Sequence, residues 1–198
     1  RAGVQKLLEK YRKQKEKLLA EKERLAKMRQ YEEKYADYAF ICGIDEVGRG
    51  PLAGPVVAGA VILPKECEIL YINDSKKLSA KKREELYDVI LEKAVAYGIG
   101  IVSNERIDEI NILQATYEAM REALSQLSPH AEYILADAVT IPRISTPQRG
   151  IIKGDAKSMS IGAASIVAKG YRDRLMETYD AVYPGYGFAA NKGYGSAE

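Results

Sequence analysis

The sequence ICGIDEVGRGPLAGPVVAGAVIL, residues 41–63, carries the strongest indication of the architecture. It continues an apolar, β-prone run over residues 38–44, which predicts a buried strand that ends at Asp45. The glycines and the proline of residues 48–54 predict a turn, and the apolar residues 55–63 predict a second strand. The stretch therefore predicts two strands joined by a short connection, with an acidic residue where the first strand ends.

Strands and helices alternate after this stretch. Further strands are predicted at residues 97–102, at residues 133–136 ahead of Asp137, and at residues 151–153. Helices are predicted from Ser79 as the N-cap to Ala96, from Asp108 or Asn111 to Leu127, and over residues 157–179. Three strands with short connections, followed by strand–helix alternation, predict an α/β fold in which helices flank a mixed sheet.

Residues 4–36 predict one long helix ahead of the sheet, because Glu, Lys, Leu and Arg dominate and neither Gly nor Pro interrupts them. Residues 1–36 hold 12 Lys and Arg against 6 Asp and Glu, whereas the remaining residues hold 18 against 22. One interpretation is a basic arm that contacts duplex phosphates. The other, which we favour, is a solvated helix that leans on the body through a partial apolar stripe, since charge runs on helices are usually solvated faces. The stripe consists of Val4, Leu7, Leu8, Tyr11, Leu18, Leu25 and Met28.

Composition limits the class of protein. With 198 residues, of which 46% are hydrophobic and 29% charged, the chain has the profile of one globular domain with an appendage. The longest apolar stretch, residues 53–63, is shorter than the roughly 20 residues that cross a bilayer, and no signal pattern opens the chain. Cys42 and Cys67 lack paired spacing, so reduced thiols of a cytoplasmic protein are expected. The single histidine, His130, is assigned a surface or structural role.

Three aspartates fall where elements begin or end. Asp45 ends the first predicted strand, Asp137 ends the fourth, and Asp155 precedes the last long helix. Carboxylates that converge at strand ends raise one another's pKa unless a cation neutralises them, and Mg²⁺ prefers such oxygen ligands. Two ions about 4 Å apart can align a water and hold the leaving oxygen of a phosphodiester. The alternative is that the aspartates cap turns and helices, and Asp155 in particular is a candidate N-cap.

Two glycine-rich segments are further candidates. Residues 48–54 have the spacing GxGxxxG and precede a predicted strand, so the dinucleotide-binding fingerprint does not apply. They are interpreted either as backbone that approaches a phosphate or sugar, with Arg49 as a donor, or as a tight turn between strands. Residues 183–196 interleave tyrosines with glycines, which suits stacking on a sugar or base but also occurs in plain surface turns.

Five segments, taken in the order of the chain, resemble the ribonuclease HII family. They are residues 41–51 (ICGIDEVGRGP), 73–79 (NDSKKLS), 135–137 (LAD), 153–158 (KGDAKS) and 192–195 (KGYG). The resemblance runs from Ile41 to the end of the chain, and the basic helical extension before it is similar to that of some bacterial members. Arg49 distinguishes this chain from the sister ribonuclease HIII family, which typically carries a different residue there.

The resemblance implies a ribonuclease H-like fold with a five-stranded mixed sheet flanked by helices. It divides the chain into a basic helical extension, residues 1–36, and a catalytic domain, residues 37–198. It also implies a catalytic two-metal site for Mg²⁺ or Mn²⁺, made by four acids. These would be Asp45, which both ions share, together with Glu46, Asp137 and Asp155.

The resemblance further implies a substrate-binding set. Gly48, Arg49, Gly50 and Tyr194 would read the ribonucleotide 2′-hydroxyl, the group that distinguishes RNA from DNA, and its junction with DNA. Lys76 and Ser158 would contact backbone phosphates. The substrates would be RNA–DNA hybrids and duplex DNA with single ribonucleotides, cut on the 5′ side of the ribonucleotide to leave 3′-hydroxyl and 5′-phosphate ends. The enzyme would act as a monomer in the cytoplasm.

Two departures from the family pattern affect these expectations. The family usually continues past the position of Glu198 through a histidine and further helical sequence, so a truncated C-terminus with weaker duplex binding is expected. Gly170 stands in a predicted helix where the family usually has a bulkier residue, which softens the helix by about 1 kcal/mol. The rival interpretations are another two-metal nuclease or strand-transfer enzyme of the same fold, which would need no 2′-hydroxyl, and a duplex-binding module without activity.

Overall fold

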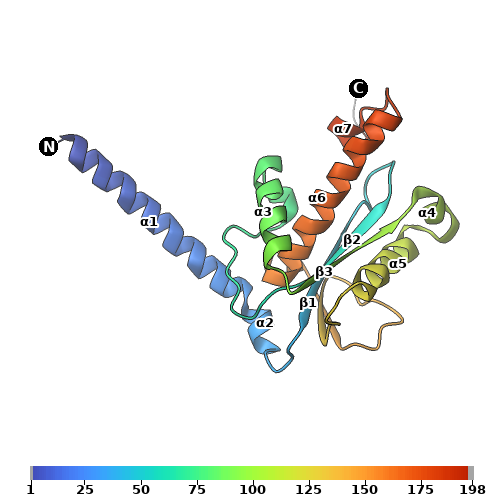
Figure 1. Cartoon of the computed structure of the whole chain (residues 1–198), viewed down its shortest axis with the longest axis horizontal. Helices are drawn as coiled ribbons and strands as arrows, with labels where there is room; N and C mark the ends of the chain where they lie inside the picture. The colour runs from blue at the N-terminus through green and yellow to red at the C-terminus, as the bar shows by residue number, and fades with distance from the viewer. Residues whose placement is uncertain (1, 196–198) are drawn as a thin grey trace.

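The computed structural model describes residues 2–195, in which five strands form one sheet (Figure 1). The strands are β1 Ile41–Val47, β2 Val56–Ile62, β3 Ala96–Val102, β4 Tyr133–Asp137 and β5 Gln148–Ile151. Their order across the sheet is β3-β2-β1-β4-β5. β1, β2 and β3 pair antiparallel, whereas β1, β4 and β5 pair parallel. The predicted mixed sheet is therefore confirmed, and its central strand β1 takes part in both kinds of pairing.

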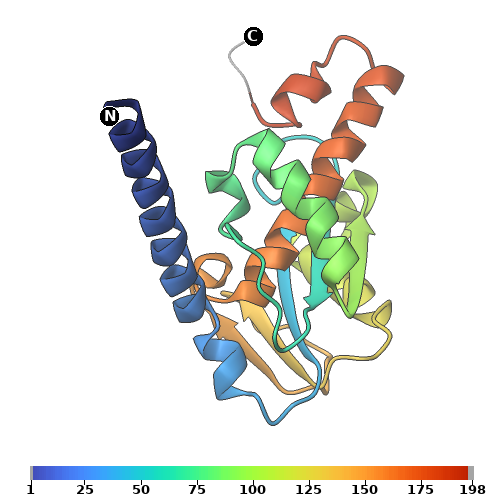
Figure 2. The ribbon, with the colours of Figure 1, turned by 60° about the vertical axis from the view of Figure 1, so that its left-hand side comes forward.

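Helices cover both faces of this sheet. The α-helices are α1 Ala2–Met28, α2 Gln30–Lys34, α3 Ala80–Lys93, α4 Asn104–Ile110, α5 Ile112–Ser125, α6 Met159–Val182 and α7 Phe188–Asn191, and the 3₁₀ helices are η1 Ser75–Lys77 and η2 Gly154–Ala156. α5 and α6 pack on opposite faces, each over its own hydrophobic cluster, and α3 packs against α6 (Figures 1 and 2). Within residues 2–195, no helix is both long and apolar enough to span a bilayer.

The N-caps test the predicted helix starts. Ser79 caps α3 as predicted, and Asn111 rather than Asp108 caps α5, since its side chain accepts hydrogen bonds from two amides of the first turn. Asp108 lies inside α4, a seven-residue helix that the prediction missed because so short a helix shows little periodicity. Ser158 caps α6, so the interpretation of Asp155 as the N-cap is wrong.

The first strand runs further than predicted. β1 pairs with β2 as far as Val47, opposite Val57, so Asp45 lies within the strand instead of at its end. The acidic residues interrupt the apolar pattern from which the end was predicted, but pairing with β2 carries the strand through them. The last strand is also displaced, because β5 is Gln148–Ile151 and not residues 151–153.

The prediction of a single helix over residues 4–36 is wrong, because the helix divides after Met28 into α1 and α2. α2 turns toward the body, where Tyr35 stacks on Tyr133 with the ring centroids 4.1 Å apart. α1 projects away from the body and is anchored near its C-terminal end, where Leu25 and Met28 are buried (Figures 1 and 2). The apolar stripe therefore reaches the body through its last two members, and its earlier members are exposed.

Gly170 in α6 lets two helices approach closely. A Cβ at this position would lie 2.5 Å from the ring of Tyr87 on α3, well inside van der Waals contact. A bulkier residue would push α3 away from α6. The glycine therefore lowers helix propensity but permits the contact between the two helices.

Candidate metal centre and reader segments

Three aspartates from different elements converge on the face of the sheet that α6 covers. One carboxylate oxygen from each of Asp45, Asp137 and Asp155 lies within 4.8 Å of the others. β1 and β4 are parallel neighbours with Ile44 opposite Ala136, which places the first two aspartates side by side. Asp155 comes from η2, which follows β5. The structure thus brings together the three aspartates that the sequence singled out.

Burial and mutual repulsion disfavour the ionised forms of these carboxyl groups. Burial raises the pKa of Asp45 well above its ordinary value, and the charges of Glu46 and Asp137 raise it further. Burial also raises the pKa of Asp155, to about 6, together with the charges of Asp74 and Asp137. A divalent cation would offset both effects, because it stabilises the ionised carboxylates.

Glu46 lies next to the three aspartates but is not one of the converging group. Its Oε1 forms an ion pair with Arg49 at 3.3 Å, while its Oε2 is buried and has no hydrogen-bond partner within residues 2–195. Burial raises the pKa of Glu46, and the charge of Arg49 opposes the rise. Buried polar atoms normally have a partner, so the free oxygen fits a cation ligand. An all-carboxylate donor set is also the kind that Mg²⁺ and Mn²⁺ prefer.

Asp74 is an acid beside the cluster that sequence reasoning missed. After burial, its charge makes the largest contribution to the raised pKa of Asp155. Its Oδ1 accepts a hydrogen bond from the amide of Lys76 at 2.9 Å, which starts η1. The Ser165 hydroxyl of α6 donates to that of Ser75 at 2.9 Å and so holds η1 on the core. Asp74 belongs to the family-like segment NDSKKLS, residues 73–79, and this was the only sequence feature that could have pointed to it.

The predicted substrate-reading residues lie in two segments that meet, residues 48–55 and residues 192–194, here called the reader segments. The Leu52 amide donates to the Gly193 carbonyl at 2.8 Å. A Cβ on Gly50 would lie 3.7 Å from the ring of Tyr194, so the tyrosine faces the glycine loop. Gly48 has a φ of +103°, and a Cβ there would overlap a backbone carbonyl, so this turn requires glycine.

Arg172 of α6 joins the two reader segments. Its side chain is 0% exposed. The guanidinium donates to the carbonyl oxygens of Pro55 at 2.9 Å, Ala53 at 3.0 Å and Lys192 at 2.7 Å. Sequence reasoning missed this residue, because an arginine in a helix resembles a solvated surface residue until the fold buries it.

The remaining predicted residues are placed at the surface or in the core. Arg49, Lys76 and Tyr194 are exposed, and so is His130 in the loop before β4. Ser158 is fully buried, and its hydroxyl donates to Glu32 at 2.6 Å. The predicted contact between Ser158 and a substrate phosphate does not fit this placement, because the N-cap position turns the hydroxyl into the core.

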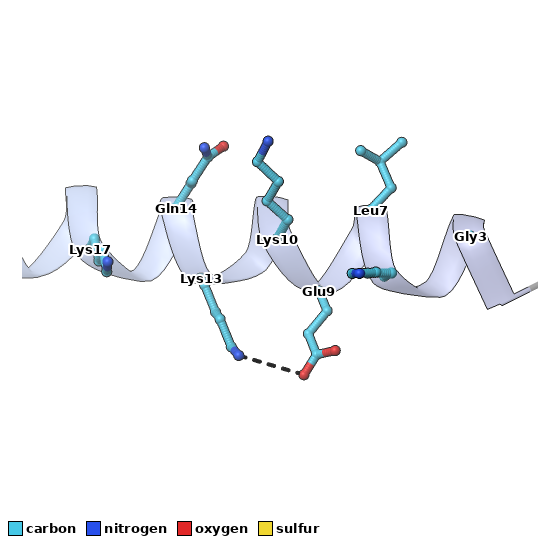
Figure 3. Close-up of a pocket in the computed structure, with 8 residues that line it drawn as sticks. Gly3, Leu7, Glu9, Lys10, Lys13, Gln14 and Lys17 are labelled. Carbon is cyan, nitrogen blue, oxygen red and sulfur yellow. Dashed lines mark ion pairs between the residues drawn. The ribbon is translucent and has the colours of Figure 1, made fainter.

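A surface hollow on α1 is separate from this centre. It is lined by residues of α1, and three of them, Lys10, Lys13 and Lys17, are labelled in Figure 3. Lys13 pairs with Glu9 one turn away at 3.8 Å. Because one exposed helix supplies all of its lining, the hollow is a groove between neighbouring side chains and not an enclosed site.

Two family models match the chain: ribonuclease HII over residues 42–198, and the ribonuclease HII N-terminal domain over residues 1–36. The ribonuclease HII of Lachnoclostridium phytofermentans is 68% identical over 198 residues, which are 100% of this chain and 78% of that protein. The ribonuclease HII of Bacillus subtilis is 54% identical over 200 residues, which cover 100% of this chain and 78% of that protein. The crystal structure of ribonuclease H2 from Pyrococcus horikoshii matches with a TM-score of 0.69 and 29% identity over 80% of this chain and 82% of that one, so the fold is ribonuclease H-like. The chain therefore belongs to the ribonuclease HII family and is a hydrolase of the ribonuclease H type.

Proposed function

We propose that this ribonuclease hydrolyses the phosphodiester on the 5′ side of a ribonucleotide, leaving 3′-hydroxyl and 5′-phosphate ends. Its substrates are RNA–DNA hybrids and duplex DNA that carries single ribonucleotides. The observation that carries the proposal is the convergence of Asp45, Asp137 and Asp155 within 4.8 Å. The ion pair between Glu46 and Arg49 joins these acids to the glycine loop, which supports cutting and reading at adjacent places.

Mg²⁺ or Mn²⁺ is the proposed cofactor, held as two ions that share Asp45, with Glu46, Asp137 and Asp155 completing the ligand sets. When bound, the ions would activate a water and neutralise charge on the leaving oxygen. The chain itself orients the carboxylates. The Glu46 amide donates to Asp45 Oδ1 at 2.7 Å, and the Gly154 amide donates to Asp137 Oδ1 at 2.7 Å. These bonds fix the rotamers of two acids and favour their ionised forms.

Gly48, Arg49, Gly50 and Tyr194 are the proposed reader of the 2′-hydroxyl. Glycines let the backbone approach a sugar closely, and the 42% exposed ring of Tyr194 is available for stacking. Lys76, exposed on η1, is the proposed phosphate contact. The proposed role is removal of ribonucleotides from DNA and of RNA from hybrids, by a monomer in the cytoplasm.

The test uses a labelled DNA duplex with one embedded ribonucleotide, an RNA–DNA hybrid and an all-DNA duplex, each with Mg²⁺, with Mn²⁺ and with chelator. We expect metal-dependent cuts in the first two duplexes, on the 5′ side of the ribonucleotide, and none in the third. Cutting of the all-DNA duplex at a similar rate would favour the alternative, another two-metal nuclease of the same fold. Binding without any cut would favour a duplex-binding module.

A further inference from the structure

Glu32, in α2, forms hydrogen bonds with the start of α6, and the proposed function assigns no role to them. Its Oε1 accepts hydrogen bonds from the hydroxyl of Ser158 at 2.6 Å and from the hydroxyl and amide of Ser160 at 2.6 Å and 3.0 Å. Its Oε2 is buried and has no hydrogen-bond partner among the described residues. The donors lie 126 and 128 positions later in the chain, so these bonds join the N-terminal extension to the start of α6.

These bonds complete a helix start that has no acid of its own. α6 has 24 residues, and its first turn contains no acidic residue. The Ser158 hydroxyl accepts from the Ile161 amide at 3.2 Å, and Glu32 takes the hydrogen bonds that Ser158 and Ser160 donate. A carboxylate at a helix N-terminus is stabilised by the free amides and by the helix dipole. Glu32 thus places a carboxylate from another helix at the N-terminus of α6, where it accepts from the Ser160 amide and from the hydroxyl of the N-cap Ser158.

The start of α6 directly follows the segment that supplies Asp155. Asp155 lies three residues before Ser158, within the connector 154–158. At the start of this connector, the Gly154 amide donates to Asp137 Oδ1 at 2.7 Å. At its end, the Ser158 amide donates to the Gly154 carbonyl at 2.8 Å, and the serine hydroxyl is held by Glu32. The connector that carries Asp155 is therefore fixed at both ends.

α2 is itself held in place against the strand that carries another acid of the centre. Tyr35 follows α2 and stacks on Tyr133, the first residue of β4, with the centroids 4.1 Å apart. Arg149 of β5 donates to the Tyr35 hydroxyl at 3.1 Å. β4 ends at Asp137, so the extension contacts the two segments that supply Asp137 and Asp155.

We propose that Glu32 is a positioning residue for the metal centre: by fixing the start of α6 it sets the place of the Asp155 carboxylate. The inference rests on the proposed metal-dependent function. Through Glu32, the N-terminal extension would help to position a ligand of the metal centre. Residues that orient metal ligands typically change metal affinity by about 10-fold to 100-fold when removed.

The experiment measures Mn²⁺ affinity by calorimetric titration, together with the Tm in chelator, for the full chain and its variants. Glu32→Ala is expected to weaken Mn²⁺ binding about 10-fold. Glu32→Gln keeps an accepting oxygen but not the charge, so a smaller loss, about threefold, is expected. Glu33→Ala is the matched control, because Glu33 is the exposed neighbour in the same helix, and wild-type affinity is expected for it.

The outcomes separate positioning from mere stabilisation. If Glu32→Ala lowers the Tm but binds Mn²⁺ as the wild type does, or if Glu33→Ala weakens binding equally, the proposal is overturned. Should Glu32→Ala not fold, Glu32→Gln and Ser160→Ala decide, and unchanged affinity in both would overturn it. A wild-type protein that binds no Mn²⁺ would instead remove the metal centre itself, and the role of Glu32 with it.

Discussion

In the metal centre, three aspartates crowd within 4.8 Å of one another, whereas in the reader segments one buried cation, Arg172, is surrounded by three carbonyl oxygens. Burial disfavours the charge in both places: it raises the pKa of Asp45 and lowers the pKa of Arg172. Arg172 finds its compensation in the chain's own carbonyls. The aspartates receive amide hydrogen bonds from Glu46 and Gly154, but no basic side chain faces them among the groups that shift the pKa of Asp45 or Asp155. The cluster therefore keeps the like-charge repulsion that the proposed cation would offset.

This difference implies that the two regions can be damaged separately. A change among the acids should alter the response to metal and the rate of cutting on every substrate. A change in the reader segments should alter the choice of substrate and leave metal binding as it was.

Asp45→Asn should lower cleavage of every substrate by about 1,000-fold or more, because it removes the carboxylate proposed to be shared by both ions. The fold should survive, since a neutral amide replaces a buried charge that burial disfavours. Cleavage rates, circular dichroism and the Tm in chelator check both parts. Cleavage at the wild-type rate would remove Asp45 from the metal ligands.

Arg172→Met should lower kcat/KM on the single-ribonucleotide duplex by about 100-fold, because the two reader segments lose their shared anchor. Each carbonyl left without a donor costs about 1–3 kcal/mol, so the Tm should fall as well. Mn²⁺ affinity should stay at the wild-type value. Arg174→Met, a change in the same helix at a partly exposed arginine that pairs with Glu84, is the control.

The separation fails if Arg172→Met weakens Mn²⁺ binding as strongly as it weakens cleavage. It also fails if the preference for ribonucleotide-containing DNA stays at the wild-type value while the overall rate falls.

Tyr194→Ala should reduce the preference for a ribonucleotide over an all-DNA duplex by about 10-fold, since stacking of an aromatic ring is worth about 1–3 kcal/mol. The preference is the ratio of kcat/KM values on the two duplexes. Tyr183→Ala is the control, because Tyr183 is an exposed tyrosine upstream of the reader segments. An unchanged ratio in Tyr194→Ala would remove this residue from the reader.

The gain in Tm on adding Mn²⁺ should be a few degrees larger at pH 8 than at pH 5. The pKa of Asp155 is raised to about 6, so without metal its stabilising contribution is present at low pH and is lost as the pH rises through 6. The ionised carboxylate is also the form that binds Mn²⁺. At pH 8, bound metal therefore restores the folding stability that ionisation of Asp155 removes. Thermal unfolding at both pH values, with and without Mn²⁺, checks the difference. An equal gain at both would separate this carboxyl from metal binding.

The sequence was sufficient to predict a mixed sheet with flanking helices and to single out Asp45, Asp137 and Asp155. Alternating strand and helix patterns locate the strands, and parallel neighbours such as β1 and β4 bring Asp45 and Asp137 together. The helix start at Ser79 was predictable because an N-cap is a local signal. The end of β1 was not, since pairing with β2 carries the strand through residues that interrupt its apolar pattern.

The supporting residues could not be predicted, because their roles depend on contacts between distant parts of the chain. Arg172 binds carbonyls of residues 117 and 119 positions earlier, and Glu32 binds serines 126 and 128 positions later. Neither carries a local pattern that separates it from a solvated surface residue. Ser158 was assigned to a phosphate from its place in a motif, and its burial became visible only with the fold.

The most direct test of the proposed metal centre is anomalous diffraction at the manganese edge from crystals soaked in Mn²⁺. We expect peaks among Asp45, Glu46, Asp137 and Asp155, with the position of the reader segments unchanged from that in metal-free crystals. The absence of any peak at these four acids, with peaks elsewhere on the protein, would contradict the claim that they form the metal centre.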